Sequence, residues 1–253
     1  MYFSKKLQKF NNIKHCFFSR NNGFSKGIYK SLNCGIGSKD KKKNVLYNLR
    51  IVKKKIGLNS KKIFLNYQIH SNKIVFIEKK FKQIKKRFRA DAIITNQSKL
   101  PIAVLTADCV PILLYDCKKN IIAAIHAGWR GALSGIIDNV ISLIIKKGGK
   151  RKNIIAAIGP SISKNSYNIG KDLQEKFMRQ SKKNKIFFKK KNNVIYFNLP
   201  GYVKYQLNLN KIVNIETINI DTFDKKNNFF SARRSLISKH DDYGRNISII
   251  MIN

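Results

Sequence analysis

The sequence predicts one domain of the α/β or layered α+β class. Strand-like apolar runs alternate along the chain with segments of helical pattern, which is typical of these classes. The runs are continuously apolar, which indicates strands covered on both faces. No internal repeat, proline-rich linker or glycine/serine hinge divides the 253 residues. Because a chain of this length can bury its core without cross-links, we expect one domain over residues 1–253, with residues 1–15 as a basic N-terminal extension.

Seven apolar runs predict the strands. In chain order they cover residues 63–69, 92–95, 102–106, 111–115, 121–125, 154–158 and 247–251. Four segments between or beside them are predicted to be helical. These cover residues 44–56, 132–146, 170–180 and 199–207. Three lysine-rich tracts are interpreted as solvated loops or helix ends, where charge costs little. They cover residues 39–43, 79–89 and 182–191.

The charge of the chain is strongly unbalanced. Fifty-two basic residues against 13 acidic ones give a net charge of +39, which by itself would favour an acidic partner such as nucleic acid or a membrane surface. However, 42 of the basic residues are lysines scattered among asparagine and isoleucine, and arginine, the usual base reader, is scarce. We interpret the charge as a trace of an A/T-rich genome. Nucleic acid is therefore expected to bind only as it would to any polycation, with strong salt dependence.

Membrane insertion and export are not indicated. Apolar runs fall short of the roughly 18 residues of a spanning helix, and the basic N-terminus lacks the apolar region and cleavage site of a secretory signal. Cysteines at positions 16, 34, 109 and 117 show neither Cys-x-x-Cys pairs nor the density of a secreted scaffold. We expect a cytoplasmic, monomeric protein in which any cysteine that matters acts as a lone thiolate.

Three predicted strands end in residues that bind soft or borderline metals. His70, Cys109 and His126 follow the runs 63–69, 102–106 and 121–125. If these strands share a sheet, their ends can bring two imidazoles and one thiolate together. Such a set leaves one open position on a tetrahedral zinc, which is typical of catalysis. The spacing alone is weak support, because no short motif such as His-Glu-x-x-His is present.

A glycine-rich turn follows His126, just before a predicted helix. Gly128 and Gly131 permit close approach of the backbone, and a helix N-terminus offers free N–H groups to an anion. Arg130 would add a bidentate clamp for an oxyanion or a phosphate. Alternatively, Trp129 belongs to the core and Arg130 forms a surface ion pair. A second glycine turn at residues 159–163 faces the same ligand or is an ordinary connection.

Several motifs of this chain occur in the order of one bacterial family. The two most specific blocks are Thr106-Ala107-Asp108-Cys109-Val110-Pro111 and His126-Ala127-Gly128-Trp129-Arg130-Gly131. The others are Phe18-Ser19-Arg20, Gly23-Phe24-Ser25, Ser31-Leu32-Asn33, Gln68-Ile69-His70, Ala90-Asp91-Ala92, Gly159-Pro160-Ser161-Ile162 and Gly244-Arg245. From about residue 16 to the C-terminus, the chain resembles the YfiH-type proteins, also called laccase-domain or polyphenol-oxidase-like proteins.

The resemblance implies a fold, an activity and a set of ligands. The fold would be a four-layer α/β/β/α sandwich with mixed sheets. The activity would be that of a purine nucleoside phosphorylase acting on adenosine, inosine, guanosine and methylthioadenosine, with adenosine deaminase as a side activity, so the partners would be purine nucleosides and inorganic phosphate. Carried over residue by residue, the resemblance makes His70, Cys109 and His126 the zinc ligands, the same residues that the strand ends indicate.

The remaining site residues are assigned as hypotheses. Arg130, with N–H groups of the glycine turn, would position phosphate, and Gln68, Gly128, Trp129 and Gly131 would bind substrate. Asp108 is the candidate for moving a proton. Because adjacent side chains on a strand point to opposite faces, the alternative is that Asp108 only orients the groups around Cys109.

The chain departs from the family pattern at two places. The segment Phe230-Ser231-Ala232-Arg233-Arg234 has an alanine where the family tends to have the histidine of a Ser-His-Arg motif, which leaves the role of the loop at residues 240–243 open, although His240 could substitute in part. The family's Asn-Arg pair near the first helix reads Asn48-Leu49-Arg50 here.

Two other kinds of enzyme remain as alternatives. A metal-free hydrolase would use Cys109 as nucleophile and His126 or His70 as base. A copper-dependent polyphenol oxidase would fit the older family name, but copper is the less favoured metal, since blue-copper sites need a weak axial ligand and no methionine lies near these residues in sequence.

Overall fold

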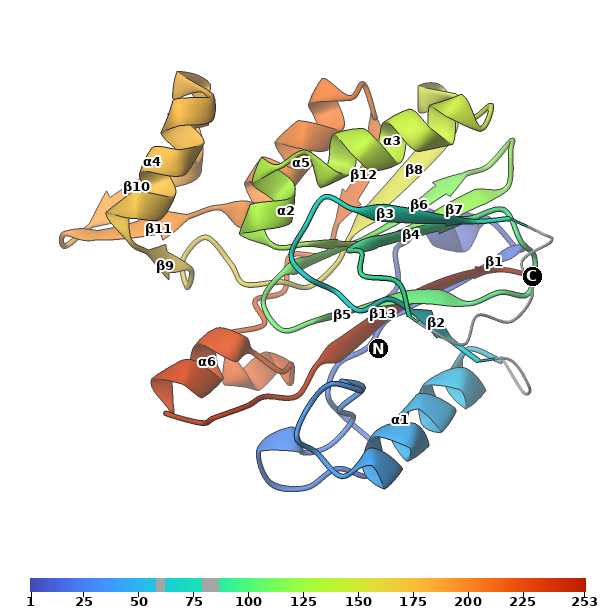
Figure 1. Cartoon of the computed structure of the whole chain (residues 1–253), viewed down its shortest axis with the longest axis horizontal. Helices are drawn as coiled ribbons and strands as arrows, with labels where there is room; N and C mark the ends of the chain where they lie inside the picture. Colours follow the sequence, from blue (N-terminus) through green and yellow to red (C-terminus); the bar gives the residue numbers. More distant parts are fainter. Residues whose placement is uncertain (58–61, 79–86) are drawn as a thin grey trace.

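Two mixed β-sheets packed face to face form the centre of the computed structural model, which describes residues 1–57, 62–78 and 87–253 (Figure 1). The first sheet has the strand order β12-β8-β6-β7-β4-β3, and the second has the order β1-β13-β5-β2. The strands of the first sheet are β3 (Ile74–Ile77), β4 (Ala92–Thr95), β6 (Val110–Asp116), β7 (Ile121–Ala127), β8 (Ile154–Ile158) and β12 (Asn214–Thr217). Those of the second are β1 (Ile13–Phe17), β2 (Phe64–Leu65), β5 (Ile102–Thr106) and β13 (Asn246–Ile252). Parallel and antiparallel pairs occur in both sheets.

Helices cover the outer face of each sheet. The six-stranded sheet packs against α2 (Trp129–Leu133), α3 (Ile136–Lys146) and α5 (Leu199–Leu209), and the four-stranded sheet packs against α1 (Lys42–Lys55) (Figure 1). The order of layers is therefore helix, sheet, sheet, helix. This confirms the predicted four-layer α/β/β/α sandwich with mixed sheets.

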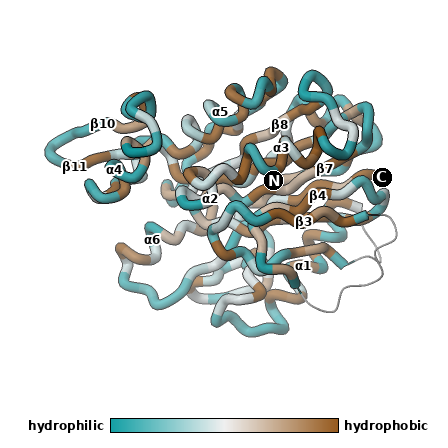
Figure 2. The backbone as a smooth tube through the Cα atoms, turned by 45° about the horizontal axis from the view of Figure 1, so that its top comes forward, coloured by the Kyte–Doolittle hydropathy of each residue, from teal (hydrophilic) through white to brown (hydrophobic). Residues whose placement is uncertain are grey.

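The alternation of side chains along β13 shows how one apolar run serves two cores. Ile247, Ile249 and Met251 point toward α1, whereas Ile250 and Ile252 pack between the two sheets. All seven residues of this strand are buried. Continuous apolarity predicts this arrangement, because successive side chains of a strand face opposite layers. Figure 2 shows the same concentration of hydrophobic residues in strands β3, β4 and β7 of the six-stranded sheet.

Most predicted strands lie where the apolar runs place them. The bounds of β4, β5 and β8 match the runs, and β6, β7 and β13 are each two residues longer. The run 63–69 is an exception, since only Phe64–Leu65 forms a strand. Its later backbone N–H groups bond elsewhere, Tyr67 to Phe88 and Ile69 to Asp91, so the chain leaves the sheet before His70.

The helix predicted over residues 132–146 is two helices. Gly135, with φ of 85°, adopts the left-handed conformation between α2 and α3 and ends the first of them. Elsewhere the predicted helices are confirmed within two residues at each end, and α4 covers Lys171–Gln180. A further short helix, α6 (Ala232–Ile237), lies near the C-terminus and was not predicted.

The lysine-rich tract 182–191 is ordered structure and not a loop. It contains a 3-10 helix (Lys182–Phe187) and strand β10 (Phe188–Lys191), which pairs with β11 (Val194–Phe197), and β11 pairs with β9 (Asn168–Ile169). The lysines of β10 are exposed, while Phe188 stacks on Phe197 at a centroid distance of 4.8 Å. With α4, this small sheet projects from the sandwich (Figure 1). In the tract 79–89, residues 79–86 lie outside the described residues.

The basic N-terminal segment packs onto the sandwich. It contains a 3-10 helix (Leu7–Lys9), and β1 begins at Ile13. Leu7 is buried, and the Glu216 carboxylate at the end of β12 accepts hydrogen bonds from the Ser4 hydroxyl and the Lys6 N–H. Other 3-10 turns are Gly27–Tyr29, Arg151–Asn153 and Lys225–Asn227. Within residues 1–57, 62–78 and 87–253, no helix has the length and apolar character needed to cross a membrane.

Candidate metal centre

His70, Cys109 and His126 meet where the two sheets join. His70 follows β2, Cys109 lies in the bend between β5 and β6, and His126 is in β7. One ligand atom from each lies within 4.8 Å of the other two, and Cys109 Sγ is 3.9 Å from His70 Nε2. The sequence-based premise of one shared sheet is wrong, because β2 and β5 belong to the four-stranded sheet and β7 to the other. The β5–β6 connection passes between the sheets and so brings Cys109 beside β7.

The backbone around two of these residues is unusual. His70 has φ of 57° and Asp108 has φ of 86°, both in the left-handed region that non-glycine residues rarely adopt. Residues 107–109 form a bend, so the alternation of a strand does not apply to Asp108 and Cys109. Strained backbone of this kind persists where surrounding contacts fix it.

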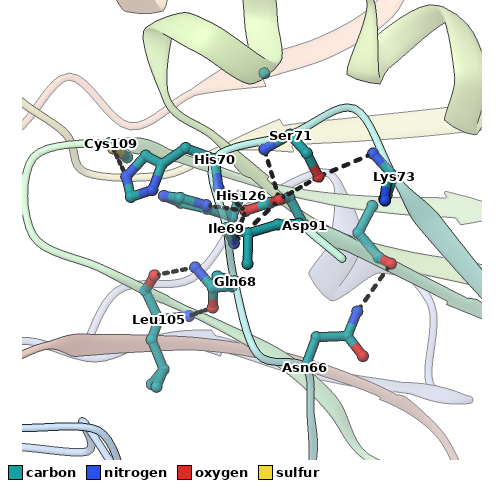
Figure 3. A network of polar contacts seen from close by, with 12 residues as sticks. Asn66, Gln68, Ile69, His70, Ser71, Lys73, Asp91, Leu105, Cys109 and His126 are labelled. Carbon is teal, nitrogen blue, oxygen red and sulfur yellow. Dashed lines mark hydrogen bonds and ion pairs between the residues drawn. The ribbon is translucent and has the colours of Figure 1, made fainter. Parts of the chain in front are cut away.

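Asp91 supplies many of those contacts. Its carboxylate oxygens accept hydrogen bonds from the backbone N–H groups of Ile69, His70 and Ser71, at 2.7 to 3.3 Å, and from the Ser71 hydroxyl. One of the oxygens also lies 2.9 Å from His126 Nδ1 (Figure 3). Asp91 therefore orients one candidate ligand directly and holds the loop that carries another. Nδ1 of His126 faces the carboxylate, which leaves Nε2 for a metal.

In the metal-free cluster the charges favour a Cys109 thiolate beside a protonated His126, and zinc would displace that proton because a coordinated imidazole is neutral. Burial opposes ionisation of the Cys109 thiol, but the neighbouring His126 and His70 imidazoles lower its pKa below the usual value. Burial likewise opposes the charged form of His126, yet Cys109 and Asp91 raise its pKa. For Asp91, burial is outweighed by the hydrogen bonds from His126 and Ser71, which lower the pKa to about 2. A thiolate is the form of cysteine that binds metals.

The donor set and its spacing fit a tetrahedral zinc. Bonds of about 2.0 to 2.3 Å at tetrahedral angles separate neighbouring ligand atoms by about 3.4 to 3.8 Å. The observed ligand atoms lie within 4.8 Å of one another, so closing around zinc would need shifts of about 1 Å. Two imidazoles and one thiolate leave one position, and the site opens on a pocket of about 230 Å³.

Gly128 and Gly131 allow the close packing of this centre. A Cβ atom on Gly128 would lie 2.9 Å from His70 Cδ2 and 3.1 Å from Cys109 Sγ. On Gly131 it would lie 2.8 Å from the Ser71 carbonyl oxygen. The two glycines predicted to bind substrate thus touch the candidate ligands and the loop beside them.

Two of the other predicted site residues, Trp129 and Arg130, lie away from the pocket. Arg130 is exposed, with its guanidinium 5.1 Å from the centroid of the half-buried Trp129 ring, and the Lys176 ammonium lies 5.5 Å from the same ring. Neither Trp129 nor Arg130 is among the described residues that line the pocket. Gln68 does line it, but both ends of its side-chain amide pair with the backbone of Leu105, at 2.7 and 2.8 Å.

The Asp108 carboxylate is buried and points into a polar network. It accepts hydrogen bonds from the hydroxyls of Thr222 and Ser231 and from the Arg233 N–H, at 2.7 to 2.8 Å. Burial raises the pKa of Asp108, and these donors oppose the shift. The contacts favour the orienting role over the proton-moving one, because they attach the C-terminal segment to the bend that carries Cys109.

Sequence reasoning missed several pocket residues. Arg87, Tyr67, Tyr243 and Arg245 line the pocket. Arg245 stacks on Tyr243 and bonds to Asp242, which also accepts hydrogen bonds from Tyr29 and from the Lys39 N–H. His240 is exposed and does not line the pocket. Asp91 had two signals, since it is an acidic residue just before a fully buried strand and belongs to the quoted Ala90-Asp91-Ala92 motif.

Comparisons with known proteins find a family, similar sequences and a similar fold. Residues 14–253 match the family model described as multi-copper polyphenol oxidoreductase laccase. A Rickettsia conorii protein named purine nucleoside phosphorylase RC0672 is 34% identical over 82% of this chain and 86% of its own length. A Haemophilus influenzae protein named purine nucleoside phosphorylase is 32% identical over 94% of each chain. The crystal structure of Neisseria meningitidis NMB0706 superposes with a TM-score of 0.83 at 28% identity, covering 96% and 95% of the two chains.

Proposed function

The chain belongs to the multi-copper polyphenol oxidoreductase laccase family, in which its YfiH-type relatives lie, and on that premise we propose that it is a zinc-dependent purine nucleoside phosphorylase. The observation that carries the proposal is the meeting of His70, Cys109 and His126 at the pocket, with ligand atoms within 4.8 Å of one another. The names of the relatives support the reaction class.

Zinc held by these three residues would supply a Lewis acid that polarises an oxygen or nitrogen of the substrate. His126 would bind through Nε2 while Asp91 holds its Nδ1. Cys109 would bind as the thiolate, which its histidine neighbours already favour. His70 is the most exposed of the three and lies closest to solvent at the pocket.

Arg245 is the residue we assign to phosphate, in place of Arg130. Its guanidinium lines the pocket, and hydrogen bonds to Tyr243 and Asp242 use two of its five N–H donors. The others donate no hydrogen bond within the described part of the chain and could pair with a phosphate in the planar geometry that arginine favours. Arg87 lines the same pocket and adds a second positive charge.

In the reaction, a phosphate oxygen would form a bond to the anomeric carbon while the C–N bond to the purine breaks. The electron pair of that bond leaves with the base, which takes up a proton. Positive charge develops on the sugar, so holding phosphate close to the anomeric carbon lowers the barrier. Adenosine, inosine, guanosine and methylthioadenosine are the proposed substrates. Deamination of adenosine is proposed as a side activity.

The test incubates pure protein with adenosine, inosine and methylthioadenosine, with and without phosphate. Free base that appears only with phosphate supports phosphorolysis, and inosine formed from adenosine supports deamination. If zinc-replete protein yields neither product, the proposal is wrong. Cys109→Ser and Arg245→Ala should each lower the phosphorolysis rate, the first with loss of zinc and the second with zinc retained.

A metal-free hydrolase is the second candidate. The low pKa of the Cys109 thiol and its distance of 3.9 Å to His70 Nε2 favour it, because a thiolate beside a histidine is a nucleophile. Metal analysis of protein purified without chelator separates the two. About one zinc per chain supports the phosphorylase, whereas metal-free protein with rapidly alkylated Cys109 supports the hydrolase.

Copper-dependent phenol oxidation is the third reading of the site, suggested by the family description. Blue-copper centres combine two histidines and one cysteine with a weak axial ligand, often methionine. The described residues that line the pocket include no methionine. Phenol oxidation by copper-loaded protein would favour this reading over zinc.

A further inference from the structure

A second cavity, of about 560 Å³, lies beside the turn that follows β8. Its walls come from three segments: residues 159–165 after β8, residues 198–204 at the start of α5, and residues 217–221 at the end of β12. It shares no lining residue with the pocket at the metal centre. Its volume lies within the range of roughly 300 to 1,000 Å³ found for small-molecule sites.

Two ammonium groups in this cavity have no carboxylate partner. Lys164 and Lys204 both line it, and neither forms an ion pair within the described part of the chain. They come from different segments, so the fold brings the two charges to one place. An anion with more than one negative charge would neutralise both.

Asp221, the carboxylate of the cavity, already has its partners. Its oxygens accept hydrogen bonds from the N–H groups of Ser163 and Phe223 and from the hydroxyls of Ser163 and Ser166. Because the Asp221 carboxylate already accepts four hydrogen bonds, it acts as a structural part of the cavity wall and has few lone pairs left to bind a cation. The cavity therefore favours anions, with Lys164 and Lys204 as the groups available to a ligand.

The hydroxyl of Ser161 is the second feature that indicates a ligand. Ser161 is 5% exposed and lines the cavity. Its backbone groups pair with Ile220 and Thr222, but its hydroxyl has no hydrogen-bond partner among the described residues. It is also absent from the buried atoms that lack a partner, so its oxygen reaches the cavity. A polar group in this setting pairs with water or with a ligand.

The rest of the lining is partly apolar. Pro200, Ile218 and Ile220 face the cavity together with the backbone of Gly159. These residues provide a surface on which a ring can lie, while the lysines and Ser161 take a charged group. A bare inorganic anion would leave this surface unused.

We propose that this cavity binds a small phosphorylated molecule with a ring, of the size of a nucleoside monophosphate, through Lys164, Lys204 and Ser161. The phosphate pairs with the two ammonium groups and accepts a hydrogen bond from the Ser161 hydroxyl, and the ring lies against Pro200 and Ile218. The site is separate from the metal centre, and the proposal does not depend on the activity assigned there.

The test measures binding of adenosine 5′-monophosphate, inorganic phosphate and adenosine by calorimetry at physiological salt. We expect the monophosphate to bind more tightly than either part alone. Lys164→Ala with Lys204→Ala should raise its Kd about tenfold or more, because hydrogen bonds to charged groups are lost. Ser161→Ala should weaken binding several-fold. Both lysines are exposed, so the variant should fold.

Two controls locate the site. Lys189→Ala with Lys190→Ala removes the same charge from exposed positions on β10, and Arg245→Ala alters the pocket at the metal centre. Neither should change the Kd by more than about twofold. Ligand-dependent protection from hydrogen exchange should appear in residues 159–165 and 217–221.

Three results would overturn the proposal. An equal loss of affinity for the monophosphate in the Lys164/Lys204 and Lys189/Lys190 double variants would show attraction to net charge alone. Loss of binding in Arg245→Ala alone would place the ligand at the metal centre. Phosphate that binds as tightly as the monophosphate, with the same loss of affinity in the Lys164 and Lys204 double variant, would show an anion site without a place for the ring.

Discussion

The carboxylate of Asp91 connects His126 to the loop of His70 and Ser71. Asp91→Asn keeps the shape of the side chain, but it removes the charge and one acceptor that these donors share. We expect zinc to bind about 10 to 100 times more weakly, the usual effect of losing a group that orients a ligand. Competition with a chelator measures this. The exposed Asp172→Asn on α4 is the matched control, and equal affinities in the two variants would contradict the role of Asp91.

Gly128 provides a steric test of the same centre. In Gly128→Ala, the new methyl group would lie 2.9 Å from His70 and 3.1 Å from Cys109, so at least one candidate ligand must move. We expect a folded protein that retains less than about half of the zinc, since metal bonds tolerate only a few tenths of an ångström. In the control Gly170→Ala, the methyl group meets the side chain of exposed Asp172, which can turn away. Full zinc content in Gly128→Ala would show that the three residues do not close around a metal.

His15 makes stability depend on pH. Burial lowers its pKa from 6.5 to about 4, although the charge of Glu216 opposes the shift, and its Nε2 accepts a hydrogen bond from the Ser4 N–H. Between these values the unfolded chain binds the proton more readily, so the free energy of unfolding falls as pH drops from about 6.5 to 4. The loss attributable to His15 is about 3 kcal/mol at most. Denaturant unfolding across this range should show a flatter dependence in His15→Gln, and identical curves would contradict the assignment.

At the scale of single elements, Glu216 tests how the N-terminal segment is held. Its carboxylate accepts hydrogen bonds from Ser4, Lys5 and Lys6, which joins the first residues of the chain to the end of β12. Glu216→Gln should lower the free energy of unfolding by about 1 to 2 kcal/mol, because hydrogen bonds to a charged group are weakened. It should also speed proteolysis within residues 1–9. Glu175→Gln is the control, because Glu175 forms only exposed ion pairs with Lys171 and Arg179 along α4. It should change the free energy of unfolding by less than about 0.5 kcal/mol.

The elements that the sequence predicts well are those decided by local pattern. Strands β4, β5 and β8 are buried on both faces, so their apolar runs are unbroken and their ends are sharp. By contrast, Phe188 is the one apolar residue of β10. The three lysines that follow it are exposed, so the sequence pattern there resembles that of a solvated loop. The break between α2 and α3 at Gly135 could have been predicted from the sequence, since glycine favours the left-handed conformation that ends a helix.

The candidate site was predictable in part for a related reason. His70, Cys109 and His126 stand at the ends of apolar runs, where a polar residue is conspicuous. Arg87 belongs to a lysine-rich tract and Arg245 to the Gly244-Arg245 motif, which carries no assigned role, and only the tertiary fold brings both to the pocket. The position of Arg130 outside the pocket also depends on the tertiary fold. Helix α2 starts at Trp129, and the Arg130 side chain lies against the Trp129 ring.

At the scale of the whole molecule, the sandwich explains why the site lies at a junction. The chain crosses between the sheets in the β5–β6 connection, and a crossing bend cannot keep regular strand geometry. Asp108 adopts its positive φ there, and the network with Thr222 and Ser231 ties the bend to the C-terminal segment. The candidate metal centre therefore depends on contacts from sequence positions 69 to 233, and it can form only when both sheets have assembled.

The net charge of the whole chain predicts that salt stabilises the fold. Thirteen acidic residues cannot pair with 52 basic ones, so the folded state carries repulsion that the expanded chain relieves. Raising sodium chloride from 0.05 to 0.5 M shortens the screening length from roughly 14 to 4 Å. We expect the melting temperature to rise by about 3 to 6 °C, equivalent to about 1 to 2 kcal/mol for a chain of this size. Replacing Lys189, Lys190 and Lys191 with glutamine should reduce the rise, because it removes three neighbouring charges from an exposed strand. A melting temperature that stays constant or falls with salt would mean that ion pairs outweigh the repulsion among lysines.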